Sequence, residues 1–511
     1  MVSALLLDTE CESRLGFDLP HPDDLRSRPH PLEGGASPML ERLEQQPRLT
    51  SNQWKLIITG NLADLLDFFD FFLIGYVLAF ITKEWQLTYW QGAVILLASG
   101  IGAVPGAFFW GWVADKIGRR TVFILTALNV ALATGIMALT PGPNGWISGW
   151  LFLALFRLLV GVGNAGLYAV DMPLVQEFMP TKKRGWVGAL ITTLLPAGSM
   201  LGGVAGWLLA PIIGWRGLFL IGLVPIVLVL MVRYWVPESP RWLMQMGRHE
   251  EARRSLAWAL MADPEEITLP TTGPELERGS WWELFKYPRS VIAGCLVGLT
   301  QTGGVGLGLW GATLFVLVLR ISPADAAFLM IFVNMAAIAG RFSVTALIEL
   351  LGRCGTGTLY CAAAAVLMVL AGYLHNVVLG SVSLFFVLVM AQNFFGSAAY
   401  SVAGPYMTEI WPTRLRASGM GLAYGVGNSG KIVGPLGLAL ILGAKDLIRP
   451  AANLDSLGLA FLYFASWYGL GIIAYWFIGF ETKGRSFEEI DAALTELPGA
   501  PSSSGRSLPL R

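Results

Sequence analysis

Charged residues are scarce in this chain. Lys, Arg, Asp and Glu make up 14% of its 511 residues, whereas soluble globular domains carry about 25%. Cysteine and histidine are rarer still, with four residues of each type. The cysteines show no metal-ligand spacing, and the histidines fall in tails, in loops or at a helix end. These scarcities argue against a soluble protein, a metal site, a disulfide framework and a histidine proton relay.

Apolar residues are abundant in place of charged ones. They form 54% of the chain, and the mean hydropathy is +0.59. An α-helix needs about 20 apolar residues to cross ~30 Å of hydrocarbon. The chain is therefore expected to be an all-α integral membrane protein with 12 transmembrane helices. The predicted spans are residues 54–80, 89–114, 120–140, 147–176, 186–212, 216–236, 289–319, 324–348, 356–374, 379–408, 416–443 and 457–480.

Positive charge is distributed unevenly between these spans. Of the 35 Lys and Arg residues, 28 fall in the two terminal segments and in or near every second gap, and five fall in or near the other gaps. The remaining two, Arg157 and Lys431, lie well inside predicted helices. This bias predicts that both termini are cytoplasmic. Residues 1–53 and 481–511 are expected to be disordered tails, and the first has no signal-peptide pattern.

The longest polar gap, at 237–288, divides the chain into two halves of six predicted helices, at 54–236 and 289–480. Glu-x-x-Pro-x-x-x-Arg follows the fourth helix in EFMPTKKRG and recurs 232 residues later in EIWPTRLRASG. GWVADKIGRR follows the second helix, and Arg341 with the Gly352-Arg353 pair is a worn copy after the eighth. The similarity predicts two parallel six-helix units with a substrate between them. The gap itself is expected to be a cytoplasmic linker with short amphipathic helices.

The repeated loops carry acidic and basic residues near predicted helix ends. Helix ends expose unpaired backbone groups and a partial charge, so charged side chains are stabilising there. We expect ion pairs across the cytoplasmic face that hold the two halves shut on that side; the alternative is that the basic residues are ordinary positive-inside anchors. The candidate gate residues are Asp115, Arg119, Arg120, Glu177, Arg184, Glu409 and Arg416.

These motifs, together with PESPRWL and ETKGRSFEEI, resemble the cytoplasmic motifs of the major facilitator superfamily. More narrowly, they are similar to those of its sugar-porter and organic-acid:proton symporter branches. The resemblance covers residues 54 to about 490. It implies a carrier in which two halves rock about a central site, with no ATP hydrolysis and no enzymatic activity.

The first predicted helix carries three carboxyl groups. Asp64, Asp67 and Asp70 follow one another at intervals of three residues in NLADLLDFFDFFLIGYVL. An ionised side chain at mid-bilayer costs at least ~2.5–3.5 kcal/mol, so such residues are functional candidates. Asp64 is nearest the cytoplasmic end and is expected to be hydrated, whereas Asp67 and Asp70 lie deeper.

Arg157, in the fourth predicted helix, is expected at the depth of Asp70. A nearby guanidinium favours the ionised carboxylate, and burial favours the protonated form. We therefore predict proton coupling by Asp70, with Asp67 as the other candidate, under the control of Arg157. Proton-coupled sugar porters have an Asp and an Arg at the matching positions, and organic-acid symporters have a D-x-x-D-like pair. The alternative is a static ion pair between two helices.

The C-terminal half lacks the polar set of a sugar porter. Its seventh helix has one glutamine, Gln301, with no Asn or Tyr after it. Lys431 could attract a carboxylate or snorkel to an interface, and Asp171 either pairs with a loop Arg or lines the pathway. Aromatic and amide side chains near a cation suit a small carboxylate, with an aromatic ring as one option. The predicted substrate-binding residues are Gln301, Trp310, Asn393, Tyr400, Tyr424 and Lys431, with Gln392 and Asn428 as further candidates.

The sequence thus predicts a monomeric, proton-coupled importer of a small organic acid in the plasma membrane, for example a bacterial inner membrane. No cofactor, metal or nucleic-acid partner is expected, because the proton gradient is the energy source. A sugar or polyol symporter, an efflux antiporter using the same carboxylate, and a non-transporting sensor on the same fold remain open. A channel fits poorly with two gate-like loops and no filter motif.

Overall fold

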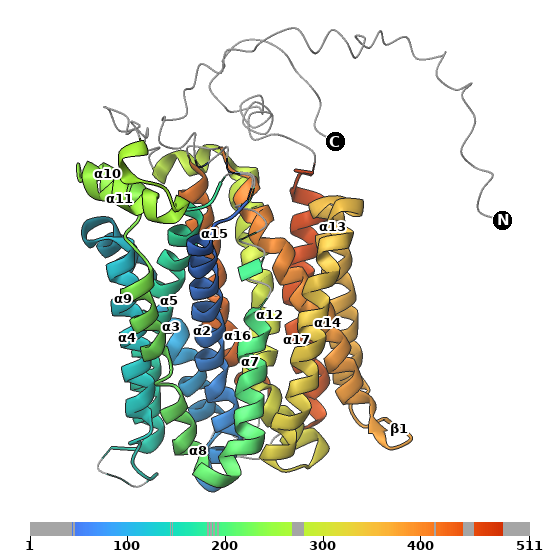
Figure 1. Cartoon of the computed structure of the whole chain (residues 1–511). Helices are drawn as coiled ribbons and strands as arrows, with labels where there is room; N and C mark the ends of the chain where they lie inside the picture. The colour runs from blue at the N-terminus through green and yellow to red at the C-terminus, as the bar shows by residue number, and fades with distance from the viewer. Residues whose placement is uncertain are drawn as a thin grey trace, which may run out of the picture.

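The computed structural model describes residues 48–483 together with Leu43 and Gln46. It leaves out residues 144, 146, 181–182, 184–186, 188–189, 192–193, 268–280, 413–414 and 443–453. The described part is helical apart from one short hairpin, in which β1 (Val378–Leu379) pairs antiparallel with β2 (Val382–Ser383). Figure 1 shows a bundle of long helices whose axes run roughly parallel to one another.

The helices before the linker form one group. They are α2 (Ser51–Glu84), α3 (Tyr89–Ile117), α4 (Arg119–Met137), α5 (Gly149–Glu177), α7 (Leu195–Val204), η2 (Ala205–Leu209), α8 (Ala210–Ile221) and α9 (Pro225–Trp235). The linker contains α10 (Pro240–Gln245), α11 (His249–Leu260), η3 (Pro264–Glu266) and η4 (Trp281–Lys286). Short helices were expected in this linker, and α11 has the charged outer face typical of an interfacial helix.

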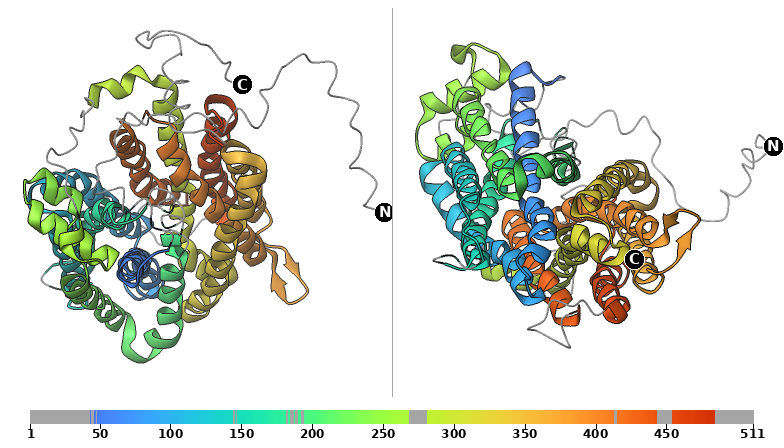
Figure 2. Two further views of the ribbon diagram at one scale, coloured as in Figure 1. Left: turned by 45° about the horizontal axis from the view of Figure 1, so that its top comes forward. Right: turned by 90° about the horizontal axis from the view of Figure 1, so that it is seen from below.

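The helices after the linker form the other group. They are α12 (Pro288–Leu319), α13 (Pro323–Tyr373), α14 (Leu384–Glu409), α15 (Arg416–Asn428), α16 (Gly430–Leu442), η6 (Leu454–Ser456), α17 (Leu457–Ile472) and η7 (Ile473–Ile478). We call the first group the N-terminal half and the second the C-terminal half. Figure 2 shows them side by side, the blue and green helices on one side and the yellow to red helices on the other.

Local sequence explains where the first helices begin. Thr50 and Thr88 each stand three residues before a glutamine, and in both cases the threonine hydroxyl accepts the glutamine backbone N–H. The glutamine side chain in turn accepts the threonine backbone N–H, at 2.9 Å for Gln53 and 3.0 Å for Gln91. This reciprocal capping satisfies two donors that the helix itself leaves unpaired.

Eleven described helical stretches are long and apolar enough to cross a membrane. One of them, Leu195–Trp235, has 41 residues and would measure about 60 Å if straight, twice the hydrocarbon thickness. It is broken at Gly214, whose φ is 70°. Similarly, Gly352 (φ 75°) separates two helices within α13, so the predicted spans 324–348 and 356–374 are two helices that meet at this residue.

Apolar side chains cover the outside of the bundle. Large residues such as Ile212, Trp476 and Phe477 are 79%, 67% and 72% exposed. A protein surrounded by water rarely exposes so much contiguous apolar surface, whereas lipid favours it and helices satisfy their own backbone groups. The protein is a multi-pass membrane protein.

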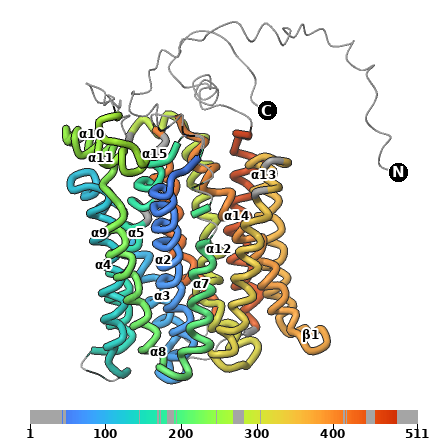
Figure 3. Tube along the Cα trace, in the orientation of Figure 1, coloured from blue at the N-terminus to red at the C-terminus, as the bar shows by residue number. Residues whose placement is uncertain are grey.

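The described ends of the chain, at the start of α2 and after η7, both lie at the end of the bundle that carries α10 and α11 (Figures 1 and 3). The two halves touch each other near the opposite end. A Cβ atom added to Gly75 of α2 would lie 2.5 Å from the backbone oxygen of Leu309 in α12. There, the Trp207 ring packs against that of Phe328, tilted by 45°, with 4.7 Å between ring centres.

Candidate functional site

Asp70 and Arg157 meet in the interior of the N-terminal half. Asp70 is on α2 and Arg157 on α5, and both side chains are 1% exposed. Nη1 of Arg157 lies 3.4 Å from Oδ2 of Asp70, and the hydroxyl of Thr134 on α4 donates to Oδ1. The expected depth match between these two residues is therefore observed, and Thr134 is a partner that the sequence analysis did not name.

Arg157 has further partners besides the carboxylate. Its Nη1 donates to the backbone oxygen of Asp70 at 3.2 Å, and its Nη2 donates to the backbone oxygen of Phe71 at 3.1 Å. Ser99 of α3 accepts a longer bond from Nη2 at 3.4 Å. The guanidinium therefore stays hydrogen bonded when the carboxylate is protonated, which lowers the cost of breaking the ion pair.

Asp67 lies one turn away on α2, in a small cavity. About 30 Å³ of that cavity is accessible to the centres of water molecules. Lys431 lines the same cavity, with its Nζ 5.1 Å from the centre of the Phe71 ring. Oδ1 of Asp67 is buried and makes no hydrogen bond. Tyr424 and Asn428 also line this cavity, as do Gln301 and Tyr400, so six of the residues predicted from the sequence gather here.

A larger cavity lies between the two halves. About 90 Å³ of it is accessible to the centres of water molecules, which leaves room for several waters or a small solute. Gln301, Asn393 and Tyr400 line it, and Gln301 and Tyr400 also line the smaller cavity. The N-terminal half contributes the Phe68 and Phe72 rings of α2, so the walls combine aromatic faces with amide and hydroxyl groups.

Trp310 lies elsewhere, and its assignment to the substrate site needs correction. It is 2% exposed and lines neither of these cavities. Its ring packs against Tyr89 of α3, with 6.1 Å between ring centres, and a Cβ on Gly92 would lie 3.3 Å from it. Trp310 thus fills the contact between the halves at the end opposite α10 and α11.

Two polar residues in the cavities were not among the predicted site residues. Arg341, named above only as part of the worn motif copy, is 4% exposed in α13 and lines the larger cavity. Its Nε donates to Ser397 at 2.8 Å, and its guanidinium lies 4.8 Å from the Tyr400 ring centre. Asn164 of α5 is 6% exposed, lines the smaller cavity, and has no partner for either side-chain polar atom. Arg341 stands eleven residues before Gly352, about 16 Å along a helix, and that position indicates a buried cation.

A hydrogen-bonded network ties the helix ends of the N-terminal half together beside α10. Glu177, at the end of α5, forms an ion pair with Arg119 of α4 and accepts a hydrogen bond from the hydroxyl of Ser239. The next carboxylate, Glu238, accepts the backbone N–H groups of Arg119 and Arg120, each at 3.0 Å. A carboxylate at the first N–H groups of a helix satisfies donors that the helix leaves unpaired and complements its dipole.

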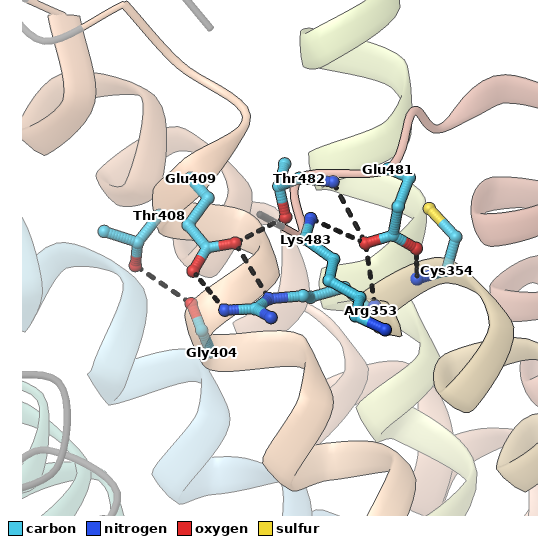
Figure 4. A network of polar contacts seen from close by, with 8 residues as sticks. All are labelled: Arg353, Cys354, Gly404, Thr408, Glu409, Glu481, Thr482 and Lys483. Atoms are coloured by element: carbon cyan, nitrogen blue, oxygen red, sulfur yellow. Dashed lines mark hydrogen bonds and ion pairs between the residues drawn. The ribbon is translucent and has the colours of Figure 1, made fainter. Parts of the chain in front are cut away.

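The C-terminal half contains the same network in different residues (Figure 4). Nε and Nη2 of Arg353 each donate to Glu409 at 3.2 Å, and Thr482 donates to Glu409 at 2.5 Å. Glu481 accepts the backbone N–H groups of Arg353 at 2.9 Å and of Cys354 at 3.0 Å. Gly352 and Arg353 therefore occupy the same structural position in the C-terminal half as Gly118 and Arg119 in the N-terminal half.

In the described residues these ion pairs do not join the two halves, so a latch between the halves stays a prediction. Each described pair joins helices of one half, so it stabilises that half internally. Arg120 donates to the backbone oxygen of Arg233 at 2.6 Å, and the backbone oxygen of Asp115 accepts the indole N–H of Trp242 at 3.0 Å. The remaining gate candidates fall outside the described part of the chain: Arg184 entirely, and Arg416 in its side chain.

Comparison with known proteins identifies the family. The profile of the family described as "Sugar (and other) transporter" matches residues 55–494. The chain belongs to this family. It is a transporter of the major facilitator superfamily and not an enzyme.

Several curated proteins are similar to this transporter over most of their length. A niacin transporter of Acinetobacter baylyi is 27% identical, with 88% of this chain and 99% of the relative covered. A glucose transporter of Staphylococcus epidermidis is also 27% identical, with the same coverage. A cis,cis-muconate transport protein of Acinetobacter baylyi is 25% identical, covering 85% and 96%. Two of these relatives are named for acids and one for a sugar.

Among solved structures, the fold is similar to that of the E. coli xylose transporter XylE. A partially occluded, inward-open structure of that protein superposes with a TM-score of 0.66 at 18% identity, covering 86% of this chain and 100% of XylE. At that identity the likeness establishes the fold alone.

Proposed function

We propose that this transporter is a proton-coupled importer of a small organic acid. The observation that carries the proposal is the buried Asp70–Arg157 ion pair, one turn of α2 from a cavity that holds Lys431. A carboxylate beside a guanidinium can bind and release one proton, because protonation breaks the ion pair while the guanidinium keeps its other acceptors. No cofactor is required, since the proton gradient supplies the energy.

Phe71 links the proton site to the substrate cavity. Its backbone oxygen accepts a hydrogen bond from Arg157. Its ring lines the smaller cavity and lies 5.1 Å from Lys431. When protonation of Asp70 loosens the ion pair, a shift of Arg157 pulls on the backbone that carries this ring. A carboxylate bound at Lys431 would sense that shift, and this is how one proton and one anion become coupled.

The wider architecture belongs to the same proposal. We place twelve spans in the plasma membrane with both termini in the cytoplasm, so that the end with α10 and α11 faces inward. The two six-helix halves are residues 54–236 and 289–480, joined by the 237–288 linker, and a monomer contains one complete pathway between them. The contacts between the halves at the opposite end support an inward-facing state.

A sugar symporter is the second candidate, and a specific observation favours it. The larger cavity is lined by Gln301, Asn334, Asn393 and Tyr468, which offer uncharged donors and acceptors suited to hydroxyl groups. Its aromatic walls suit a sugar ring as well as an aromatic acid. The glucose transporter among the relatives supports this alternative, and the niacin and muconate transporters support an acid.

Thermal unfolding of the purified protein with a panel of ligands would decide between them. The panel contains nicotinate, benzoate and cis,cis-muconate as acids, nicotinamide as an uncharged control for nicotinate, and glucose and xylose as sugars. A ligand at 100 times its Kd stabilises the folded state by about 2.7 kcal/mol. We expect an acid to raise the melting temperature and its uncharged counterpart to leave it unchanged.

Two further measurements sharpen the result. The shift should be larger at acidic than at alkaline pH if a proton binds with the substrate. Lys431→Gln should remove the shift caused by the acid. Stabilisation by glucose or xylose but by no acid would contradict the organic-acid proposal and support the sugar alternative.

A further inference from the structure

Asn164 of α5 is a buried amide that makes no side-chain hydrogen bond within the described part of the chain. The residue is 6% exposed, and neither its Nδ2 nor its Oδ1 has a partner there. Most buried polar side-chain atoms in proteins are paired, because an unpaired donor or acceptor in the interior is destabilising. An amide kept in this position is therefore expected to find its partner in a bound molecule.

The spacing of polar residues along α5 directs Asn164 to the interior. Arg157, Asn164 and Asp171 stand seven residues apart, and seven residues make almost two full turns, so the three residues share one face of the helix. All three are buried, with exposed fractions of 0%, 6% and 2%. Asn164 thus lies about 10 Å along α5 from the arginine of the proton site, on the same buried face.

Asn164 lines the smaller cavity, whose walls come from both halves. Asp67 and Asn164 are the polar side chains that the N-terminal half contributes to this lining, and Lys431 on α16 is the cation that the C-terminal half contributes. Oδ1 of Asp67 is likewise buried without a hydrogen bond in the described residues. The lining therefore offers two unpaired acceptors, on Asp67 and Asn164, together with the N–H donors of Asn164 and Lys431.

The size of the smaller cavity limits what can enter it. About 30 Å³ is accessible to the centres of water molecules, which is room for about two waters or for the polar end of a larger solute. Phe68, Phe72 and Gln301 line both cavities, so the two are neighbours. A solute whose ring lies in the larger cavity can therefore place its polar end beside Asn164.

We propose, building on the organic-acid function above, that Asn164 determines specificity and that the transported acid carries a hydrogen-bond donor close to its carboxylate. Lys431 and Nδ2 of Asn164 bind the carboxylate, and a hydroxyl or N–H group of the substrate donates to Oδ1 of Asn164, beside Asp67. A carboxylate alone only accepts hydrogen bonds and leaves both acceptors of the cavity unpaired. A site built to pair with such a donor discriminates against an analogue that lacks it.

Calorimetric titration of the purified full-length protein with matched benzoates tests this specificity. Benzoate is compared with its three hydroxyl isomers and with the three methoxy counterparts, which occupy the same ring positions but cannot donate. We expect at least one hydroxyl isomer to bind about tenfold more tightly than both benzoate and its own methoxy counterpart. Equal Kd values throughout the series would contradict the proposal and leave water as the partner of the amide.

Variants of Asn164 test whether this residue is responsible. Leucine has a similar shape but no polar atom, so Asn164→Leu should bind the hydroxyl isomer and its methoxy counterpart equally. Asn164→Asp retains an acceptor oxygen and should keep the preference, while every acid binds more weakly because the N–H donor is lost. A preference that survives in Asn164→Leu would refute the assignment.

Asn129 provides a matched control on α4. Its Oδ1 is also buried without a partner in the described residues, but it lines neither cavity. Asn129→Leu should therefore keep the wild-type preference for the hydroxyl isomer. Loss of the preference in both leucine variants would show a general effect of removing a buried amide and would contradict a specific role for Asn164.

Melting of the substrate-free protein separates a role in binding from a role in folding. If the partner of Asn164 is the substrate, leucine removes an unpaired buried amide, and Asn164→Leu should melt at or above the temperature of the wild type. A marked decrease, or a failure to fold, would show that the amide has a structural partner and would overturn the proposal.

The titration also distinguishes failure of this specificity from failure of the organic-acid function. Equal binding of benzoate and its hydroxyl and methoxy derivatives would leave the organic-acid function intact and refute the role of Asn164 alone. Binding of glucose or xylose but of none of these acids would refute both.

Discussion

The two halves share one network at their α10–α11 ends and differ in their interiors. Glu177 with Arg119 in the first half corresponds to Glu409 with Arg353 in the second. The interiors differ: 232 residues beyond Asp70 and Arg157 stand Thr302 and Val389, which carry no charge. Helix ends leave backbone N–H groups unpaired in both halves, and in each half a carboxylate accepts them. Under the proposed coupling one carboxylate–guanidinium pair suffices, and the N-terminal half carries it.

The largest expected effect comes from removing the carboxylate of Asp70, which has no charged counterpart in the C-terminal half. A proton that accompanies one anion moves no net charge, so the pH difference drives the accumulation; one pH unit is worth about 1.4 kcal/mol, a tenfold substrate gradient. Asp70→Asn should abolish this accumulation in proteoliposomes, while exchange of labelled for unlabelled nicotinate continues. Thr302→Ala, at the equivalent position of the second half, should accumulate substrate like the wild type. Full accumulation by Asp70→Asn would remove this carboxylate from the coupling.

The next effect tests whether the two networks are equally important. Gly118 and Gly352 have φ angles of 98° and 75°, and a Cβ on either would collide with the carboxylate of Glu238 or Glu481. Gly118→Ala and Gly352→Ala should each cost about 1–3 kcal/mol of folding free energy, seen as a lower melting temperature. Gly111→Ala is the control, because its Cβ would meet nothing within 4 Å. A fall confined to one half would contradict the equivalence.

A smaller effect is expected from the capping carboxylates themselves. Glu238 accepts three backbone N–H groups, and Glu481 accepts four, from Arg353, Cys354, Thr482 and Lys483. Glu238→Gln and Glu481→Gln retain the shape but lose the charge, at a cost of about 1–2 kcal/mol each. The loss should be at least as large for Glu481. A greater loss at Glu238 in melting experiments would show that the halves are not equivalent.

The smallest effect is expected at an ion pair outside both networks. Arg248, which directly precedes α11, and Glu251 on α11 are about half exposed, and their side chains lie 2.6 Å apart. The hydrogen bond from Arg248 holds the pKa of Glu251 below its usual value, but water and salt screen such a pair. Arg248→Ala should leave the melting temperature unchanged. A clear decrease would mean that α11 contributes more to stability than its exposure suggests.

The sequence was sufficient for the membrane class, the family and the Asp70–Arg157 pair, because hydropathy, loop charge and helix periodicity are local signals. The larger errors concern residues whose role depends on packing between helices. Trp310 has an aromatic side chain of the kind found in binding sites, but it packs between the halves. Arg341 lies inside the predicted span 324–348 but was counted as a cytoplasmic charge, because the rule on loop charge treats a basic residue toward a span's end as cytoplasmic. Periodicity alone does not show which helix it faces.

The gate residues show the same limit. Their spacing predicted ion pairs, and ion pairs are present, but spacing does not reveal whether a pair lies within one half or between two. Glu238 and Glu481 were visible only as parts of family motifs, PESPRWL and ETKGRSFEEI. Their function as helix caps depends on a chain that returns after more than a hundred residues.

The contact at the end opposite α10 and α11 has a consequence for how the pathway opens there. Gly75 lies against the Leu309 backbone, and the Trp207 ring packs against that of Phe328. Asn334 donates to Tyr76 across the halves at 3.4 Å, a contact between neutral groups. These contacts involve backbone atoms and uncharged side chains, so dissolved salt does not weaken them by screening. Opening on that side should therefore proceed at the same rate in dilute and concentrated salt, and respond instead to temperature.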